Sequence, residues 1–239
     1  MRVITLTTDF GTGSPYVAAM KGKLLAGCPD ALLVDITHSV PAFDVFTGGF
    51  LLWAGTRDFP PGAVHLAVVD PGVGGSRRPV ALRVDGSWYV GPDNGLFGVV
   101  LKKARSHPSG IELSRPDSAS ATFEGRDVFA PAAAALAAGR PPGSLGSELE
   151  GEPAELPARP PSVLWVDNFG NLITSLEPPI AGLRLNGQEV RTAARTYSEA
   201  PPQTPFFYLG SMGLIEVGVR EARADERLEA GPGTEVQPL

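Results

Sequence analysis

The side chains best suited to chemistry lie in acidic, glycine-rich turns, each directly after an apolar run. These turns are Thr8-Asp9-Phe10-Gly11, Asp70-Pro71-Gly72-Val73-Gly74-Gly75 and Gly91-Pro92-Asp93-Asn94-Gly95. Carboxylates and amides hydrogen-bond hydroxyl and amino groups, and glycines let a backbone approach a ligand closely. One such turn alone is ordinarily a helix cap or a tight turn. Several at the carboxyl ends of strands in one sheet indicate a shared pocket.

Similar turns occur near the C-terminus. Asp167-Asn168-Phe169-Gly170-Asn171 follows the apolar run Val163–Val166, and Leu209-Gly210-Ser211-Met212-Gly213 precedes the run Leu214–Val219. The carboxylate and the amide of the first turn could accept from and donate to a zwitterion or the edge of a purine. Either turn alone is more typical of a simple chain reversal, so its interpretation depends on the others.

The motifs disfavour several other kinds of site. The glycine run at residues 72–75 lacks the Lys-Ser/Thr ending of a P-loop and the spacing of a dinucleotide fingerprint. His38, His65 and His107 are scattered without the spacing of metal ligands, so we expect no metal site. No Gly-x-Ser-x-Gly nucleophile motif is present. His65 lies within an apolar run and is predicted to be a hydrogen-bonded core residue.

Composition limits the partners and the compartment. The formal net charge is -6 and no basic stripe occurs, which argues against nucleic acid. The apolar runs are shorter than the roughly 20 residues that span a bilayer, and the N-terminus enters a strand pattern instead of a signal peptide. The single cysteine, Cys28, excludes an internal disulfide framework and is predicted to be buried. We therefore expect a cytoplasmic protein with no membrane or nucleic-acid partner.

Strands and helices alternate along the first two thirds of the chain, which predicts an α/β domain with a mostly parallel sheet. The predicted strands are Val3–Thr7, Ala31–Asp35, Val64–Val69, Val80–Val84 and Trp88–Val90, and the predicted helices are Tyr16–Ala26, Val45–Ala54, Gly95–Lys103 and Phe129–Ala138. The run Val64–Val69 is apolar throughout, as in a central strand buried on both faces. Asp85-Gly86 predicts a hairpin turn.

A proline- and glycine-rich segment at residues 139–161 marks a linker. We assign residues 1–158, which include this linker from about residue 139, to an N-terminal α/β domain, and residues 159–239 to a second domain. Short apolar runs separated by turn residues, with a further hairpin signal at Asn186-Gly187, predict that the second domain is smaller, β-rich and barrel-like.

In their order along the chain, these motifs resemble the S-adenosylmethionine hydrolase family, also called SAM hydroxide adenosyltransferases. That family is related to the enzymes that fluorinate and chlorinate S-adenosylmethionine (SAM). The likeness covers nearly the whole chain and also includes Tyr16-Val17-Ala18-Ala19-Met20-Lys21-Gly22 and Thr122-Phe123-Glu124-Gly125-Arg126-Asp127. It implies hydrolysis of SAM at C5′ to adenosine and L-methionine, without a cofactor. It also implies a homotrimer that binds SAM or adenosine between the N-terminal domain of one subunit and the C-terminal domain of the next.

The resemblance implies substrate-binding residues in both predicted domains: Asp9, Phe43, Asn94, Asp167, Asn171 and Ser211. Asp9 would bind the ribose hydroxyls, and Phe43 would line the ligand with an aromatic ring. Asp167 and Ser211 would hold the methionine part, and Asn171 would face the adenine.

Asp70, Arg77 and Glu124 are the implied catalytic residues. The first two are spaced as in the family's Asp–Arg–His set, which positions water. Glu124 departs from the pattern, because it stands in Thr-Phe-Glu-Gly where the family usually has Thr-Phe-His-Gly. We hypothesise that Glu124 replaces the histidine as a water-orienting group or base. The alternative is that it locks Arg77 in an ion pair and impairs catalysis.

Further departures bear on the choice of reaction. Ser14 stands where an Asp often follows the first turn, which weakens an expected contact with the ligand's amino group. Gly125 occupies the position of a halide-binding Ser in fluorinating relatives, and Asp70 that of an aromatic residue in chlorinating ones. Hydrolysis is therefore the favoured reaction. The alternatives are a non-catalytic adenosine- or SAM-binding protein and, less favoured, a SAM-dependent chlorinase.

Overall fold

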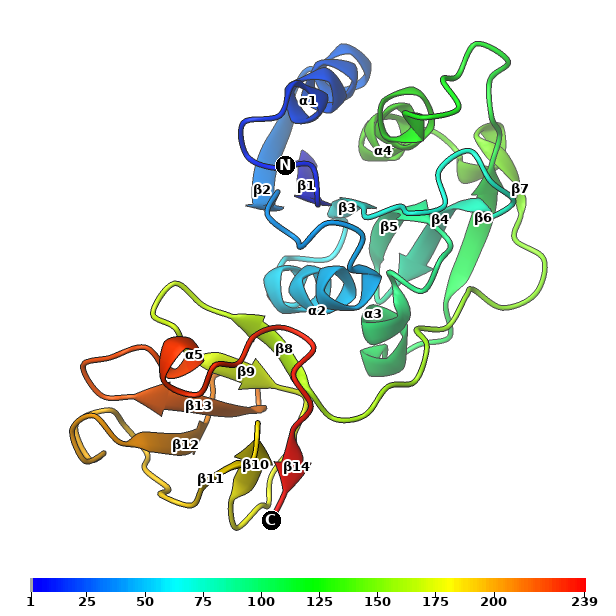
Figure 1. Cartoon of the computed structure of the whole chain (residues 1–239). Coiled ribbons are helices and arrows are strands. Elements are labelled where there is room, and N and C mark those ends of the chain that lie inside the picture. Colours follow the sequence, from blue (N-terminus) through cyan, green and yellow to red (C-terminus); the bar gives the residue numbers. More distant parts are fainter. Residues whose placement is uncertain (1) are drawn as a thin grey trace. The chain divides into compact units, whose positions relative to one another are not determined.

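The N-terminal unit is built on a seven-stranded sheet with the strand order β2-β1-β3-β5-β4-β6-β7 (Figure 1). The computed structural model describes residues 2–239, and this unit ends at Pro157. Its elements are β1 (Arg2–Thr8), α1 (Pro15–Gly27), β2 (Ala31–Thr37), α2 (Val45–Thr56), β3 (Val64–Val68), β4 (Pro79–Val84), β5 (Ser87–Pro92), α3 (Gly98–Lys103), β6 (Ser109–Leu113), the π-helical turn η1 (Gly125–Phe129), α4 (Ala130–Ala137), the 3-10 turn η2 (Pro142–Ser144) and β7 (Gly146–Glu148).

The parallel half of the sheet brings the predicted acidic turns to one edge. Strands β2, β1, β3 and β5 pair in parallel, and β4, β6 and β7 extend the sheet with antiparallel pairing. Because Thr8 pairs with Val68, the chain leaves β1 and β3 at the same level. The turns that carry Asp9 and Asp70 therefore begin side by side, as expected for strands whose carboxyl ends share an edge.

Helices cover both faces of the sheet: α1 and α4 lie on one face, and α2 and α3 on the other (Figure 1). All five residues of β3 are buried, as predicted for a central strand. The alanine-rich helix α4 packs closely on α1, since a Cβ added to Gly27 would lie 2.7 Å from the Cβ of Ala134. Cys28 is fully buried in the same core, as predicted.

The chain differs from the predicted elements at several places. Helix α3 begins at Gly98, because Gly95 has a φ of +94° and the side chain of Asn94 accepts a hydrogen bond from the Leu96 amide instead. Strands β6 and β7 were not predicted, and β7 lies inside the predicted linker. Gly146 permits their pairing, because a Cβ there would lie 1.9 Å from the Glu112 carbonyl oxygen.

His65 is the predicted core histidine. It is buried on β3, and its Nδ1 lies 2.9 Å from Thr5 Oγ1 on β1. Burial lowers the pKa of His65 from 6.5 to about 4. Between these values the unfolded chain binds a proton that the folded chain does not, so acidification favours unfolding. The contribution of neutral His65 to the free energy of unfolding is therefore present above pH 6.5 and is lost as the pH falls from 6.5 towards 4.

Acidification from pH 7 to pH 5 should lower the free energy of unfolding of the unchanged protein. We expect this loss to be about 2 kcal/mol smaller in His65→Asn. The Asn amide oxygen can replace Nδ1 as the partner of Thr5 but does not titrate. Urea unfolding of both proteins at both pH values measures the difference. Equal losses on acidification would show that His65 does not become protonated on unfolding in this range.

The C-terminal unit, Ala158 to Leu239, contains two small antiparallel sheets with the orders β12-β13-β9-β8 and β11-β10-β14. Its elements are β8 (Val163–Val166), β9 (Leu172–Thr174), β10 (Leu183–Leu185), β11 (Gln188–Val190), β12 (Pro205–Leu209), β13 (Ile215–Val219), α5 (Ala224–Arg227) and β14 (Gln237–Pro238). The predicted hairpin at Asn186-Gly187 joins β10 to β11, with positive φ at both residues. The β-rich character predicted for this region is confirmed.

Within residues 2–239, no helix combines the length and apolarity needed to cross a membrane.

Candidate active site

A buried cluster of charges joins the three residues expected to be catalytic. Arg77 donates from Nε to both carboxylate oxygens of Asp70, at 3.0 and 3.1 Å, and from Nη2 to Asp70 Oδ2. Its Nη1 lies 2.5 Å from Glu124 Oε2, close enough for an ion pair although the atoms are not aligned as a hydrogen bond. Less than a tenth of each of these side chains is exposed. The structure therefore brings Asp70, Arg77 and Glu124 together.

The cluster keeps Arg77 charged and fixed. Burial by itself lowers the pKa of Arg77, but the hydrogen bonds to Asp70 and the negative charges of Asp70 and Glu124 outweigh burial and raise that pKa. The guanidinium also lies over the ring of Phe129, 5.2 Å from its centroid. Glu124 immediately precedes η1 and Phe129 ends it, so this one π-helical turn and its N-cap supply two of the groups that contact Arg77. Such turns occur often at functional sites.

Close backbone contact holds the Asp70 loop against the segment that carries Glu124. Gly74 has a φ of +76°, and a Cβ there would lie 2.4 Å from the Ala121 carbonyl oxygen. A pocket of about 300 Å³ opens between these segments, and its lining residues are Gly74, Gly75, Arg115, Pro116, Ala119, Ser120, Ala121 and Glu124. Glycines in this loop were predicted to let the backbone approach a ligand. At Gly74 the close approach is instead to the backbone of Ala121 in the same protein.

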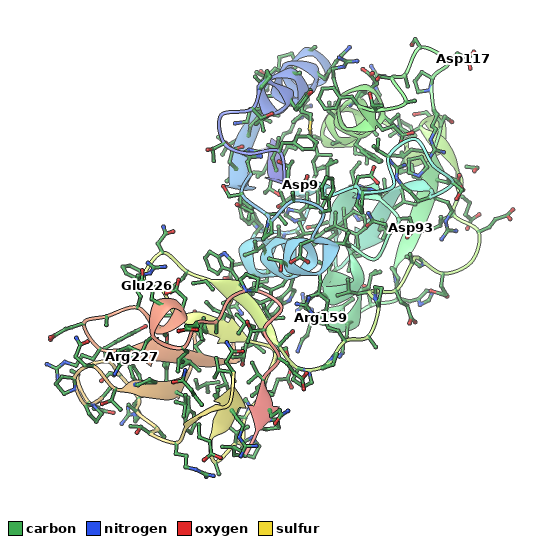
Figure 2. The ribbon with its side chains drawn as sticks, viewed as in Figure 1. Asp9, Asp93, Asp117, Arg159, Glu226 and Arg227 are labelled. Carbon is green, nitrogen blue, oxygen red and sulfur yellow. The ribbon has the colours of Figure 1, made fainter. Side chains whose placement is uncertain are left out.

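Asp9 and Phe43 are also brought together. Asp9 directly follows the end of β1 (Figure 2), and its Oδ2 accepts a hydrogen bond of 3.0 Å from the Phe43 amide. Phe43 has a φ of +67° and is 70% exposed, which is unusual for a large apolar residue. Strain of this kind at an exposed aromatic residue is typical of a functional site.

Asn94 and Asp93, at the end of β5, are engaged within the protein. The Asn94 amide donates to the Val69 carbonyl at 2.9 Å and so fixes the backbone directly before Asp70. Buried Asp93 (Figure 2) accepts from Arg78 and from the Ala154 amide, and Arg78 also donates to two carbonyls of the segment 150–152. Part of the predicted linker is therefore tied to the sheet. The role of Asn94 in substrate binding stays a prediction.

The turn between β8 and β9 contains the C-terminal candidates Asp167 and Asn171. Asp167 Oδ1 accepts from the amides of Phe169 and Asn171, and its Oδ2 accepts from Asn171 Nδ2 at 2.7 Å. Ser211 lies in the turn between β12 and β13, which is closed by the hydrogen bond from the Gly213 amide to the Gly210 carbonyl. Asp167 and Asn171 are thus in direct contact and held rigidly.

Beside these candidates lies a polar chain that the motifs did not reveal. Tyr197 and Tyr208 share a hydrogen bond of 2.8 Å, and Tyr208 donates to Glu216 Oε2 at 2.8 Å. Burial, together with the charge of Asp167, raises the pKa of Glu216 despite the hydrogen bond from Tyr208. Glu216 packs against Gly210, where a Cβ would lie 2.0 Å from its Oε1. The only signal in the sequence is an acidic residue within an apolar strand.

Sequence reasoning also missed Arg115, which donates from Nε to Glu124 Oε1 at 2.7 Å. Arg115 follows an unpredicted strand and lies in no motif, so nothing in the sequence distinguished it from a surface arginine. Among the described residues 2–239, no group of three or more His, Cys, Asp or Glu side chains is placed to hold a metal ion.

Comparison with known proteins identifies similar chains over the full length. A family model described as the SAM hydroxide adenosyltransferase N-terminal domain matches residues 4–146, and the corresponding C-terminal model matches residues 161–237. A protein named (R)-S-adenosyl-L-methionine hydrolase from Thermus thermophilus is 42% identical, with 100% of both chains covered. One of the same name from Salinispora arenicola is 40% identical over 98% of this chain and 96% of its own.

A crystal structure of an uncharacterized conserved protein from Thermotoga maritima has a TM-score of 0.89 and 29% identity, covering 99% of this chain and 100% of its own. A fluorinase from an Actinoplanes species is more distant, at 29% identity over 77% of this chain and 71% of its own.

Proposed function

The chain belongs to the SAM hydroxide adenosyltransferase family, and from this premise we propose that it hydrolyses S-adenosyl-L-methionine at C5′ to adenosine and L-methionine. The observation that carries the proposal is the buried Asp70–Arg77–Glu124 cluster at the carboxyl edge of the sheet. The names of the relatives specify the R configuration at sulfur. We extend that preference to this chain.

The chemistry of a sulfonium explains why these residues suffice. The oxygen of water or hydroxide attacks C5′, the C5′–S bond breaks, and its electron pair passes to sulfur, which leaves as the neutral thioether of methionine. The attacking oxygen loses its proton to solvent or a nearby base. No acid has to protonate the leaving group, so catalysis consists of orienting the ligand and delivering the oxygen in line with the bond. We therefore propose that no cofactor takes part.

Arg77 is the group that favours hydroxide near C5′, because a fixed cation in a water-poor site stabilises the approaching negative charge. Asp70 holds it through a bidentate pair, which fixes the plane of the guanidinium as well as its place. Glu124 forms an ion pair with Nη1 of the same guanidinium and is the proposed substitute for the family's histidine in orienting water.

Binding is proposed to use the remaining candidates. Asp9 accepts the ribose hydroxyls and so aims C5′, and Phe43 packs its exposed ring on the ligand. Asp167 and Ser211 hold the methionine part, and Asn171 faces the adenine. Asn94 contributes by supporting the loop that carries Asp70.

We propose a cytoplasmic homotrimer in which the N-terminal unit of one subunit and the C-terminal unit of its neighbour complete each site. The exposed apolar side chains beside the candidates support this, since Phe43, Phe169 and Leu209 are 70%, 78% and 58% exposed. Apolar residues exposed next to functional groups are typical of surfaces that another molecule covers. Light scattering during size-exclusion chromatography tests the assembly: a trimer mass supports it, and a monomer at micromolar concentration contradicts it.

Incubation with (R)- and (S)-SAM, followed by chromatography, tests the reaction. We expect adenosine and methionine in equal amounts, faster from the R epimer, and no chloride-dependent product. Glu124 lies between two arginines, which also keeps the binding-protein alternative open. Tight adenosine binding by calorimetry without any turnover would favour that alternative.

A further inference from the structure

The charge cluster contains one more cation than the family's water-positioning set. Glu124 Oε2 lies 2.5 Å from Arg77 Nη1, and Glu124 Oε1 accepts from Arg115 Nε at 2.7 Å. Asp70 is paired with Arg77 alone among the ion pairs of the described residues. With Arg115 the cluster holds two carboxylates and two guanidiniums, and without Arg115 one carboxylate would be in excess.

The fold brings Arg115 to this place through the register of β4 and β6. Val80 pairs with Glu112, so the start of β4 lies beside the end of β6. Arg77 comes just before β4 and Arg115 just after β6, which makes the two arginines neighbours across the strand ends. Arg115 Nη2 donates to the Arg77 carbonyl at 2.7 Å and ties the loops together.

We propose that Arg115 is a positioning residue for hydrolysis: it neutralises Glu124 and fixes its carboxylate, so that Arg77 has only Asp70 left to balance and the cluster carries no net negative charge where the attacking oxygen approaches. This inference rests on the proposed function. Without Arg115, Arg77 would be the sole cation facing two buried carboxylates, and the cluster would carry net negative charge. Such a cluster repels hydroxide. The side chain of Arg115 is 36% exposed and its Nε donates to Glu124, so the proposed effect of Arg115 is exerted through that carboxylate.

The inference makes the effect of Arg115 depend on the charge at position 124. Arg115→Gln is expected to lower kcat by about 10- to 100-fold, the range for a lost charge-assisted hydrogen bond, with little change in KM. Arg115→Lys restores the charge and recovers most of the rate. In a Glu124→His background, where no excess carboxylate remains, Arg115→Gln changes kcat by less than about 3-fold.

Steady-state kinetics with (R)-SAM on the unchanged protein, the single variants and the double variant test this, with thermal unfolding as a check of folding. Arg105→Gln is the matched control, because Arg105 is 86% exposed and pairs with Asp85, outside the cluster. The inference is overturned if Arg115→Gln keeps full activity, if it slows both backgrounds equally, or if Lys is no better than Gln. If Glu124→His is inactive, the comparison of Arg115→Lys with Arg115→Gln alone decides whether the inference holds. If the protein without any substitution does not hydrolyse SAM, both the proposed function and this role of Arg115 are refuted.

Discussion

Arg77→Lys is expected to lower kcat for SAM hydrolysis by about 100-fold or more while the chain stays folded. Lysine keeps the positive charge, so Asp70 and Glu124 are not left as unpaired buried carboxylates. It cannot reproduce the planar pairing of Nε and Nη2 with Asp70, nor place a second donor 2.5 Å from Glu124. The field at C5′ therefore loses its fixed direction, although the net charge is unchanged.

Kinetics with (R)-SAM and the binding of adenosine by calorimetry check this together. Adenosine affinity should change little, because Arg77 is proposed to act on the attacking oxygen and not on the nucleoside. Arg105→Lys serves as the control for the substitution itself, since its guanidinium is largely in solvent. A rate within about 3-fold of the unchanged protein would show that the arrangement around Arg77 is structural.

The second large effect is expected for Asp9→Asn, which should lower kcat/KM by about 100-fold. The Asn oxygen can still accept from the Phe43 amide, so the loop that presents Phe43 is retained. The variant loses the charge that strengthens hydrogen bonds from both ribose hydroxyls. Most of the loss should therefore appear in KM, accompanied by weaker binding of adenosine.

Asp58→Asn is the matched control for Asp9→Asn, because the Asp58 side chain is 87% exposed and interacts with Arg57. Binding of adenosine to both variants separates a lost ligand contact from a general effect of removing a carboxylate. Unchanged adenosine affinity in Asp9→Asn would remove Asp9 from the ribose site.

The sequence was most informative where local patterns decide the structure. Apolar runs with glycine turns predicted most strands of the seven-stranded sheet. Asp85-Gly86 and Asn186-Gly187 predicted one hairpin in each unit, because two-residue hairpin turns with positive φ favour these residue types. Strand β7 was missed because three residues among prolines and glycines carry no periodic signal. It exists through pairing with β6, which is a long-range contact.

The same distinction holds for the candidate site. Asp9, Asp70 and Asp167 follow apolar strands directly, so their place at strand ends could be predicted. Arg115 and Glu216 acquire their significance only from neighbours across the sheet. Their environments depend on strand register, which no local motif specifies.

The most direct test of the central claim is hydrolysis of (R)-SAM in water enriched in oxygen-18, followed by mass spectrometry of both products. Attack at C5′ predicts one heavy oxygen in the 5′-hydroxyl of adenosine and none in methionine, with the products formed in equal amounts. Unlabelled adenosine, a heavy oxygen on the amino-acid product, or no adenosine from correctly folded protein would contradict the claim.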